Sequence, residues 1–219
     1  MIKINKKILK IDIFKTLFFN FHYWGFKGIF VFPALIGKNV EFKKLKGTII
    51  CKNFETGIIQ IGLNEMGICP DKTTISVIEN EGDIVFYGSA HFGVGTCLSN
   101  KGKIQFGDKF VITAKSFIIC NKQISFGENV LISWDCQIMY TDFHSVYDIN
   151  SDKLLNEDSK VIIGNNCWIC NGCTITKGVK ICNDVVIASN SRIRKNVDST
   201  NCIIGDLGQV IKENVRWEQ

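Results

Sequence analysis

The sequence lacks an apolar run long enough to cross a membrane, and it has little net charge. A membrane-spanning helix needs about 18 to 20 apolar residues in succession, and no stretch of this chain reaches that length. The formal charge of +5 over 219 residues is too small to indicate a nucleic-acid partner, although it suits a small polyanionic ligand. The sequence therefore predicts neither a membrane-spanning protein nor a nucleic-acid-binding one.

An aliphatic residue returns at every sixth position in the C-terminal half of the chain. These residues are Ile163, Ile169, Ile175, Ile181, Ile187 and Ile193. Four residues after each comes a small or β-branched one: Cys167, Cys173, Val179, Val185, Ser191 and Val197. A period of six fits neither a helix nor an amphipathic strand, but it is typical of hexapeptide-repeat β-helices. The sequence predicts an all-β, parallel β-helix whose aliphatic residues point toward the axis.

The same pattern extends toward the N-terminus with a period of twenty, which is three hexads plus two extra residues at one corner. The repeated triplets are Phe86/Phe92/Leu98, Phe106/Ile112/Ile118 and Phe126/Ile132/Ile138. Four dipeptides are expected at one equivalent position of successive coils: Ile61-Gly62, Phe106-Gly107, Phe126-Gly127 and Ile163-Gly164. We therefore assign residues 47–204 to the β-helix and residues 205–219 to a C-terminal tail.

The ten cysteines are not arranged as a disulfide or metal set. Cys136, Cys167 and Cys173 occupy the small-residue position, which indicates buried, reduced thiols in a cytoplasmic protein. The Cys167-x-x-Cys170-x-x-Cys173 spacing resembles a metal motif. On a six-residue coil, however, these sulfurs lie on successive faces and do not converge, and the three histidines are not placed for zinc. No metal is expected.

Residues 1–46 are expected to form a cap on the open end of the β-helix. A basic start precedes an apolar run, as in a signal peptide, but Asp12 and Lys15 interrupt the run and no small-residue cleavage site follows. We expect a short amphipathic helix from about Lys7 to Phe19. A peripheral membrane contact through the aromatic residues of this segment is the alternative role. These aromatic residues are Phe18, Phe19, Phe21, Tyr23, Trp24 and Phe26.

The hexads stop between Ile138 and Val161, where a long loop over residues 139–161 carries His144. A loop of this length that interrupts a regular repeat is usually functional. We therefore treat His144 as a candidate catalytic residue, against the alternative of a solvated loop histidine. His22 and His91 are interpreted as structural.

Several segments together resemble the hexapeptide-repeat acetyltransferases, in particular the enzymes that O-acetylate sugars of bacterial capsules and lipopolysaccharides. The segments are Asp142–Asp148, Ile163–Ile169, Gly178–Ile181, Val186–Ser191 and Val210–Trp217. The resemblance implies a left-handed parallel β-helix, assembled as a homotrimer with active sites in the clefts between subunits. It also implies acetyl-CoA as the donor, a sugar hydroxyl as the acceptor, and the loop histidine as the catalytic base.

That base falls on His144, and an imidazole suits the task because it titrates near neutral pH and can take a proton from an attacking hydroxyl. Asp142 or Asp148 could orient the ring, although Asp142 is equally a turn residue. The resemblance places Trp168 at the acceptor and thioester pocket, with subunit packing as the alternative. It also implies backbone contacts to CoA at Asn171 and Ser189. Arg194, Lys195 and Lys212 follow and could donate to the CoA phosphates, with ordinary solvated side chains as the alternative.

The tail departs from the family pattern, because Ala-Gly-Asn-Pro-Ala-Lys is replaced here by Ile204-Gly-Asp-Leu-Gly-Gln. This changes a turn expected near the CoA site. Two other functions remain open. One is acetylation of a small acceptor, such as an amino sugar nucleotide or an amino acid. The other is a non-catalytic β-helix that serves as an assembly scaffold.

Overall fold

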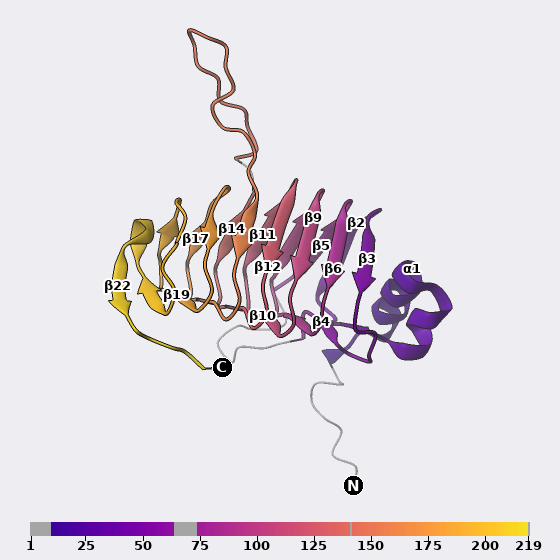
Figure 1. Cartoon of the computed structure of the whole chain (residues 1–219). Coiled ribbons are helices and arrows are strands. Elements are labelled where there is room, and N and C mark those ends of the chain that lie inside the picture. The colour runs from indigo at the N-terminus through magenta and orange to yellow at the C-terminus, as the bar shows by residue number, and fades with distance from the viewer. Residues whose placement is uncertain (1–9, 64–73, 141, 219) are drawn as a thin grey trace.

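The computed structural model describes residues 10–63, 74–140 and 142–218, and within them three sheets form the three faces of a parallel β-helix (Figure 1). The first face holds β1 (Ala34–Ile36), β4 (Ile59–Ile61), β7 (Ala90–Phe92), β10 (Phe110–Ile112), β13 (Leu131–Ile132), β16 (Trp168–Ile169), β19 (Val185–Ile187), β21 (Cys202–Ile204) and β22 (Val210–Glu213). The second face holds β2 (Val40–Leu45), β5 (Ser76–Asn80), β8 (Cys97–Asn100), β11 (Phe117–Cys120), β14 (Gln137–Met139), β17 (Thr174–Ile175) and β20 (Arg192–Ile193). The third face holds β3 (Thr48–Cys51), β6 (Asp83–Phe86), β9 (Lys103–Phe106), β12 (Gln123–Phe126), β15 (Val161–Ile163) and β18 (Lys180–Ile181).

The six-residue period is confirmed as the repeat of the fold. All six predicted aliphatic residues from Ile163 to Ile193 are buried. Equivalent residues pair across coils, as where Ile132 lies opposite Ile169, and Ile169 lies opposite Ile187. Each aliphatic residue therefore covers its equivalent in the next coil, and the interior becomes one continuous apolar column.

The period of twenty is also confirmed, and it builds an aromatic column on the third face. Phe106 stacks between Phe86 and Phe126, with ring centroids 5.1 and 5.3 Å apart and interplanar angles of 11° and 4°. One expected equivalence is wrong. Ile61 lies on the first face, where it pairs with Phe92, whereas Phe106, Phe126 and Ile163 share the third face. The reason is that strands of both faces end in an apolar residue followed by glycine, as Phe92 does.

Asparagine and aspartate shape the corner between the third and first faces. Asn129, Asn166 and Asp184 have φ angles of 54°, 53° and 58°, in the left-handed region that these short polar side chains tolerate. Asn129 Nδ2 donates to Asn166 Oδ1, and Asn166 Nδ2 donates to Asp184 Oδ1, each at 2.7 Å. The side chains thus form a ladder that ties successive coils together at this corner.

The corner between the second and third faces, here called the loop corner, is the one that accepts extra residues. It holds the two additional residues of the early coils, and Asn100 Nδ2 there donates to Asn80 Oδ1 at 2.8 Å. The same corner lies between β14 and β15, and the long loop leaves the β-helix at this point (Figure 1). Insertions here leave the pairing of the strands on either side intact.

Helix α1 (Ile13–Val31) covers the first coil. Asp12 caps its N-terminus by accepting from the backbone N–H of Lys15 at 3.0 Å. Asn20 exchanges two hydrogen bonds with the backbone of Ala34, and Phe19 is buried in the core. The helix predicted over residues 7–19 therefore begins later and ends later than expected, and its first three predicted residues lie outside the described residues.

The later end has a physical reason. Tyr23 and Trp24 also pack against the core, so the inward-facing apolar stripe continues beyond Phe19. Gly25, with φ 58° and ψ −144°, then kinks the helix without ending it. Within the described residues, no helix combines the length and the apolarity needed to cross a membrane.

The tail closes the other end of the first face. β22 runs antiparallel to β21 and pairs Lys212 with Ile203. It follows a 3₁₀ turn over Asp206–Gly208. The reversed strand occupies the edge of β21 that another parallel coil would use.

Replacement of Phe106 by alanine should lower the free energy of unfolding by about 3 to 5 kcal/mol, because it removes a buried ring from the centre of the aromatic column. Urea unfolding followed by tryptophan fluorescence measures the change. The matched control is Phe30→Ala, since this ring is exposed, and we expect a change within about 0.5 kcal/mol. Equal losses in the two variants would contradict the proposed role of the column.

Candidate functional site

The long loop forms a hairpin-like arm of two antiparallel segments, here called its branches, that projects from the loop corner (Figure 1). Its branches meet where the Leu155 N–H donates to the Val146 carbonyl at 2.8 Å, and Tyr147 bridges to Leu154. The turn near the tip is organised by Asp148, whose Oδ1 accepts from the backbone N–H groups of Asn150 and Ser151 at 3.0 and 2.8 Å. The pKa of Asp148 is lowered mainly by the hydrogen bond from the Ser151 side chain, and further by these backbone hydrogen bonds. Asp148 therefore serves the turn and does not contact the imidazole of His144.

An ion pair and an amide hold the base of the arm. Lys177, on the next coil, places its Nζ 2.6 Å from Asp142 Oδ2 and also donates to the Asn156 carbonyl. Asn156 Nδ2 donates to Asp142 Oδ2 at 3.0 Å and to the His144 carbonyl at 2.7 Å. The hydrogen bond from Lys177 is the main cause that lowers the pKa of Asp142. This network fixes the backbone on either side of His144.

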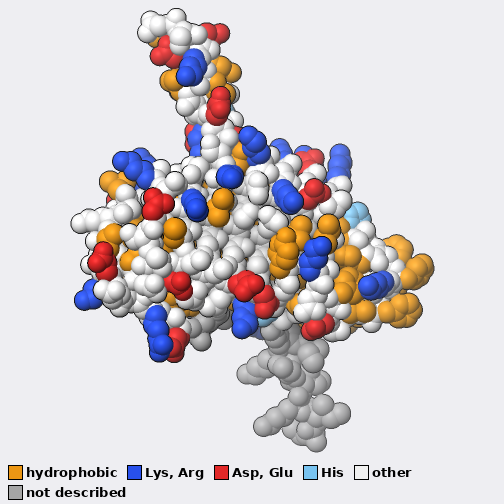
Figure 2. All heavy atoms as spheres, in the orientation of Figure 1, with side chains coloured by type: hydrophobic (Ala, Val, Ile, Leu, Met, Phe, Trp, Pro, Cys, Tyr) orange, Lys and Arg blue, Asp and Glu red, His pale blue; other side chains and the backbone are white. Residues whose placement is uncertain are grey.

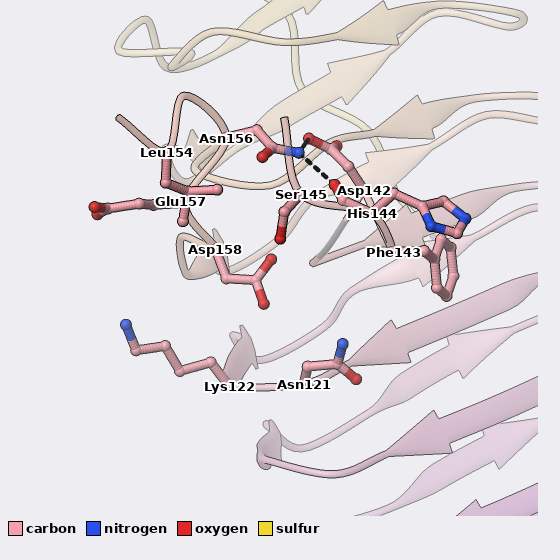
Figure 3. Close-up of a pocket in the computed structure, with 10 residues that line it drawn as sticks. All are labelled: Asn121, Lys122, Asp142, Phe143, His144, Ser145, Leu154, Asn156, Glu157 and Asp158. Carbon is pink, nitrogen blue, oxygen red and sulfur yellow. Dashed lines mark hydrogen bonds between the residues drawn. The ribbon is translucent and has the colours of Figure 1, made fainter. Parts of the chain in front are cut away.

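The His144 ring is exposed and free to meet a ligand. It lies at the rim of a cavity of about 460 Å³ between the arm and the loop corner. Figure 3 shows its imidazole pointing away from Glu157 and Leu154, on the side where Phe143 lies. Within the described part of the chain, no side chain hydrogen-bonds to this ring. The Asp142 carboxylate is engaged by Lys177 and Asn156, and Asp142 reaches His144 through a backbone hydrogen bond of 2.8 Å.

The cavity beside the arm has a polar lining. Its residues are Asn121, Lys122, Asp142, Phe143, His144, Ser145, Leu154, Asn156, Glu157 and Asp158 (Figure 3). Amides, carboxylates, a hydroxyl and an ammonium group are groups that hydrogen-bond hydroxyl-rich molecules. The cavity therefore offers donors and acceptors beside the backbone of His144, whose imidazole points away from most of the lining residues (Figure 3).

Trp168 lies on a different surface of the chain. It belongs to the first face, where its indole N–H donates to Ser133 Oγ at 3.1 Å and its ring lies 6.0 Å from that of Trp217. The tail carries Trp217 back over the β-helix, and its indole N–H donates to the Asn166 carbonyl at 2.8 Å. Since His144 leaves from the loop corner, the chain does not bring the two predicted residues together.

The residues predicted to bind CoA fall into three groups. Asn171 and Ser189 meet at the corner between the first and second faces, where Ser189 Oγ donates to Asn171 Oδ1 at 2.8 Å. Arg194 and Lys195 follow β20 and lie exposed at the loop corner. Lys212 is exposed on β22. The chain therefore does not gather these side chains around one ligand, and their role stays a prediction.

The altered tail has its own anchor, which nothing in the sequence had indicated. Arg192 on β20 forms a two-point ion pair with Asp206, with Nη2–Oδ2 at 2.7 Å and Nε–Oδ1 at 3.2 Å. The hydrogen bond from this guanidinium is the main cause that lowers the pKa of Asp206 to about 2. The family's Asn-Pro turn is therefore replaced by a turn that an ion pair fastens to the preceding coil.

The cysteines serve packing. Cys136, Cys167 and Cys173 are fully buried, as their position in the hexads predicts. Burial raises the pKa of the Cys167 thiol to about 12 and that of Cys120 to about 11. Thiols of this kind are poor nucleophiles at neutral pH. Among the described residues, no three His, Cys, Asp or Glu side chains are grouped as metal ligands.

Comparison with known proteins agrees with this architecture. The profile of the bacterial transferase hexapeptide family (six repeats) matches residues 160–195. A 24.8 kDa protein of Klebsiella pneumoniae, described as uncharacterized and in the cps region, is 30% identical over 196 residues, which are 88% of this chain and 85% of the relative.

Two solved structures match this chain over most of its length. The polySia-specific acetyltransferase NeuO is 19% identical with a TM-score of 0.53, over 85% of this chain and 79% of that one. The polysialic acid O-acetyltransferase OatWY is 22% identical with a TM-score of 0.49, over 82% of this chain and 70% of that one. The predicted fold class, a left-handed parallel β-helix, is confirmed.

Replacement of Lys177 by methionine should loosen the arm, because it removes the ammonium group that joins Asp142 to the Asn156 carbonyl. We expect amide hydrogen exchange over residues 142–156 to accelerate about fivefold, because a partly exposed ion pair contributes at most about 1 kcal/mol. The control Lys180→Met removes an exposed lysine of the neighbouring strand and should leave the arm unchanged. Unchanged exchange in both variants would contradict the anchoring role of Lys177.

The Asp206 carboxyl should titrate at about pH 2, below its ordinary value of 3.8. Because its pKa is lowered by folding, the ion pair stabilises the tail above about pH 4 and loses this effect as the pH falls toward 2. Carboxyl NMR titration measures the value. Arg192→Met should raise it toward the ordinary range but not fully, because the backbone N–H of residue 192 still donates to Asp206 Oδ1. Arg216→Met, which removes a partner of Glu218, should not move it.

Proposed function

Since this chain belongs to the bacterial hexapeptide-repeat transferases, we propose that it is an acetyl-CoA-dependent O-acetyltransferase that modifies a sugar hydroxyl of a bacterial surface polysaccharide. The relative from the cps region supports the polysaccharide context. The observation that carries the proposal is the exposed His144 ring, on an arm that is fixed at its base and whose backbone lines a polar cavity.

In the proposed reaction, the imidazole of His144 takes the proton of the acceptor hydroxyl as its oxygen attacks the thioester carbonyl. The new C–O bond forms, the C–S bond breaks, and the imidazolium returns the proton to the departing CoA sulfur. A backbone N–H near the thioester would stabilise the oxyanion of the tetrahedral intermediate. No acyl-enzyme is needed, which agrees with the burial of Cys136, Cys167 and Cys173.

The proposed assembly is a homotrimer in which a cleft between neighbours completes the site. Within one protomer, His144 leaves the loop corner whereas Trp168 lies on the first face, so a second copy would supply the tryptophan. The separated CoA residues would likewise meet across the cleft, with Asn171 and Ser189 near the pantetheine, and Arg194, Lys195 and Lys212 near the phosphates. We propose a cytoplasmic location, since the described cysteines are all unpaired.

Replacement of His144 by alanine should lower turnover about 10²- to 10⁴-fold, the usual contribution of a general base. The assay follows release of the CoA thiol with acetyl-CoA and a polysaccharide acceptor, and calorimetry should show CoA affinity nearly unchanged. The control His22→Ala removes a ring that contacts the Leu45 carbonyl in the cap and should keep turnover near that of the parent. An active His144 variant would remove the assignment.

Acceptor competition separates this function from the alternatives. Polysaccharide fragments, an amino sugar nucleotide and a free amino acid are offered to the same enzyme with acetyl-CoA. Transfer to the polysaccharide hydroxyl supports the proposal, whereas transfer only to an amine contradicts it. If calorimetry shows no CoA binding at all, the chain is a scaffold and the catalytic proposal fails.

A further inference from the structure

The outward face of α1 carries a row of exposed apolar side chains, here called the aromatic face. Its members are Ile13, Phe14, Leu17, Phe18, Phe21, Phe26 and Phe30. Three of the rings are largely in solvent, with Phe14 84%, Phe26 70% and Phe30 82% exposed. Figure 2 shows this apolar surface gathered at the cap end of the molecule. A soluble domain rarely leaves so many neighbouring large side chains uncovered, and such a patch usually marks an interaction site.

The aromatic face is continuous although the helix is kinked. Ile13, Leu17 and Phe21 recur four residues apart, and Phe14 and Phe18 lie beside them, so the first half of α1 presents one stripe. After the kink at Gly25, Phe26 contacts Phe21 edge-to-face with ring centroids 5.5 Å apart. The opposite side of the helix is already used, because Phe19 and Asn20 are buried against the first coil. Of the aromatic face, Phe18 also contacts Phe42 of β2, with ring centroids 6.1 Å apart, whereas Phe14, Phe26 and Phe30 remain largely exposed.

Charge is distributed unevenly along the chain and accompanies this face. The first 40 residues contain seven lysines and one aspartate, a net charge of +6, so the remaining residues carry a net charge of −1. No aspartate or glutamate occurs in residues 13–40. All of the net positive charge thus belongs to the segment that presents the exposed rings. A basic segment that carries an exposed aromatic helix face is typical of contact with a negatively charged lipid surface.

We propose that the aromatic face docks the protein onto an anionic phospholipid bilayer. The rings would enter the boundary between head groups and acyl chains, and the net positive charge of the N-terminal segment would favour anionic lipids. A second copy of the chain fits less well, because pairing two such faces would oppose two segments of equal positive charge. α1 lies at one end of the β-helix and the arm projects from its side (Figure 1). Docking by the cap would leave the arm and its cavity in solution.

Vesicle co-sedimentation of the full chain tests the proposal independently of any catalytic activity. Vesicles of phosphatidylglycerol and phosphatidylcholine are compared with vesicles of phosphatidylcholine alone, at low salt and at about 1 M NaCl, where the Debye length falls to about 3 Å. We expect binding to the anionic vesicles that weakens at high salt. The triple variant Phe14→Ser, Phe26→Ser, Phe30→Ser should lower the partition coefficient at least about tenfold.

The matched control is the double variant Ile149→Ser, Leu155→Ser, which removes exposed apolar side chains from the arm instead and should bind like the parent. Circular dichroism of all three proteins checks that the fold is kept. No binding to anionic vesicles, or equal binding by the triple variant, would overturn the proposal. So would light scattering that shows an oligomer of the parent dissociating in the triple variant without any vesicle binding, since the face would then join copies of the chain.

Discussion

The structure depends on one constraint, namely that equivalent residues of successive coils must stack inside a narrow three-sided interior. Because the strands pair in register, as where Ile124 lies opposite Val161 and Ile104, every apolar side chain meets its own equivalent above and below. Like side chains stack well, so phenylalanine follows phenylalanine on the third face until isoleucine replaces it at Ile163. The polar side-chain ladders lie at the corners. The stacked faces form the rigid body from which the long arm projects.

This division explains how a rigid repeat can support a projecting arm. The loop corner holds residues that do not belong to the stacked column, so residues can be added there while β14 and β15 keep their places in their sheets. The arm gains its order from the next coil, because Lys177 meets both Asp142 and the Asn156 carbonyl. His144 is thus placed by backbone contacts at the base of the arm, and its ring is left open toward solvent.

Much of the β-helix could be predicted from the sequence because stacking repeats the same residue types at fixed spacing, from Ile163 to Ile193. Ile61 was misplaced because an apolar residue before glycine ends strands on two faces. The helix end was missed because inward contacts of Tyr23 and Trp24 outweigh local pattern. Pairs such as Lys177 with Asp142 join distant positions through the coil geometry, so no local signal marks them. The predicted site residues lie on different sides of the β-helix, His144 at the loop corner and Trp168 on the first face. The order of the motifs along the chain does not reveal this separation.

The reversed direction of β22 has a consequence for assembly. A parallel β-helix is in principle endless, since its last coil presents the same open hydrogen-bonding edge as every coil before it. Here α1 covers one end. At the other end, the first face terminates in the antiparallel strand β22, which does not continue the parallel pairing of the preceding coils. On the first face, therefore, the antiparallel strand opposes fibre-like end-to-end growth, because a further parallel coil has no free edge of β21 to pair with.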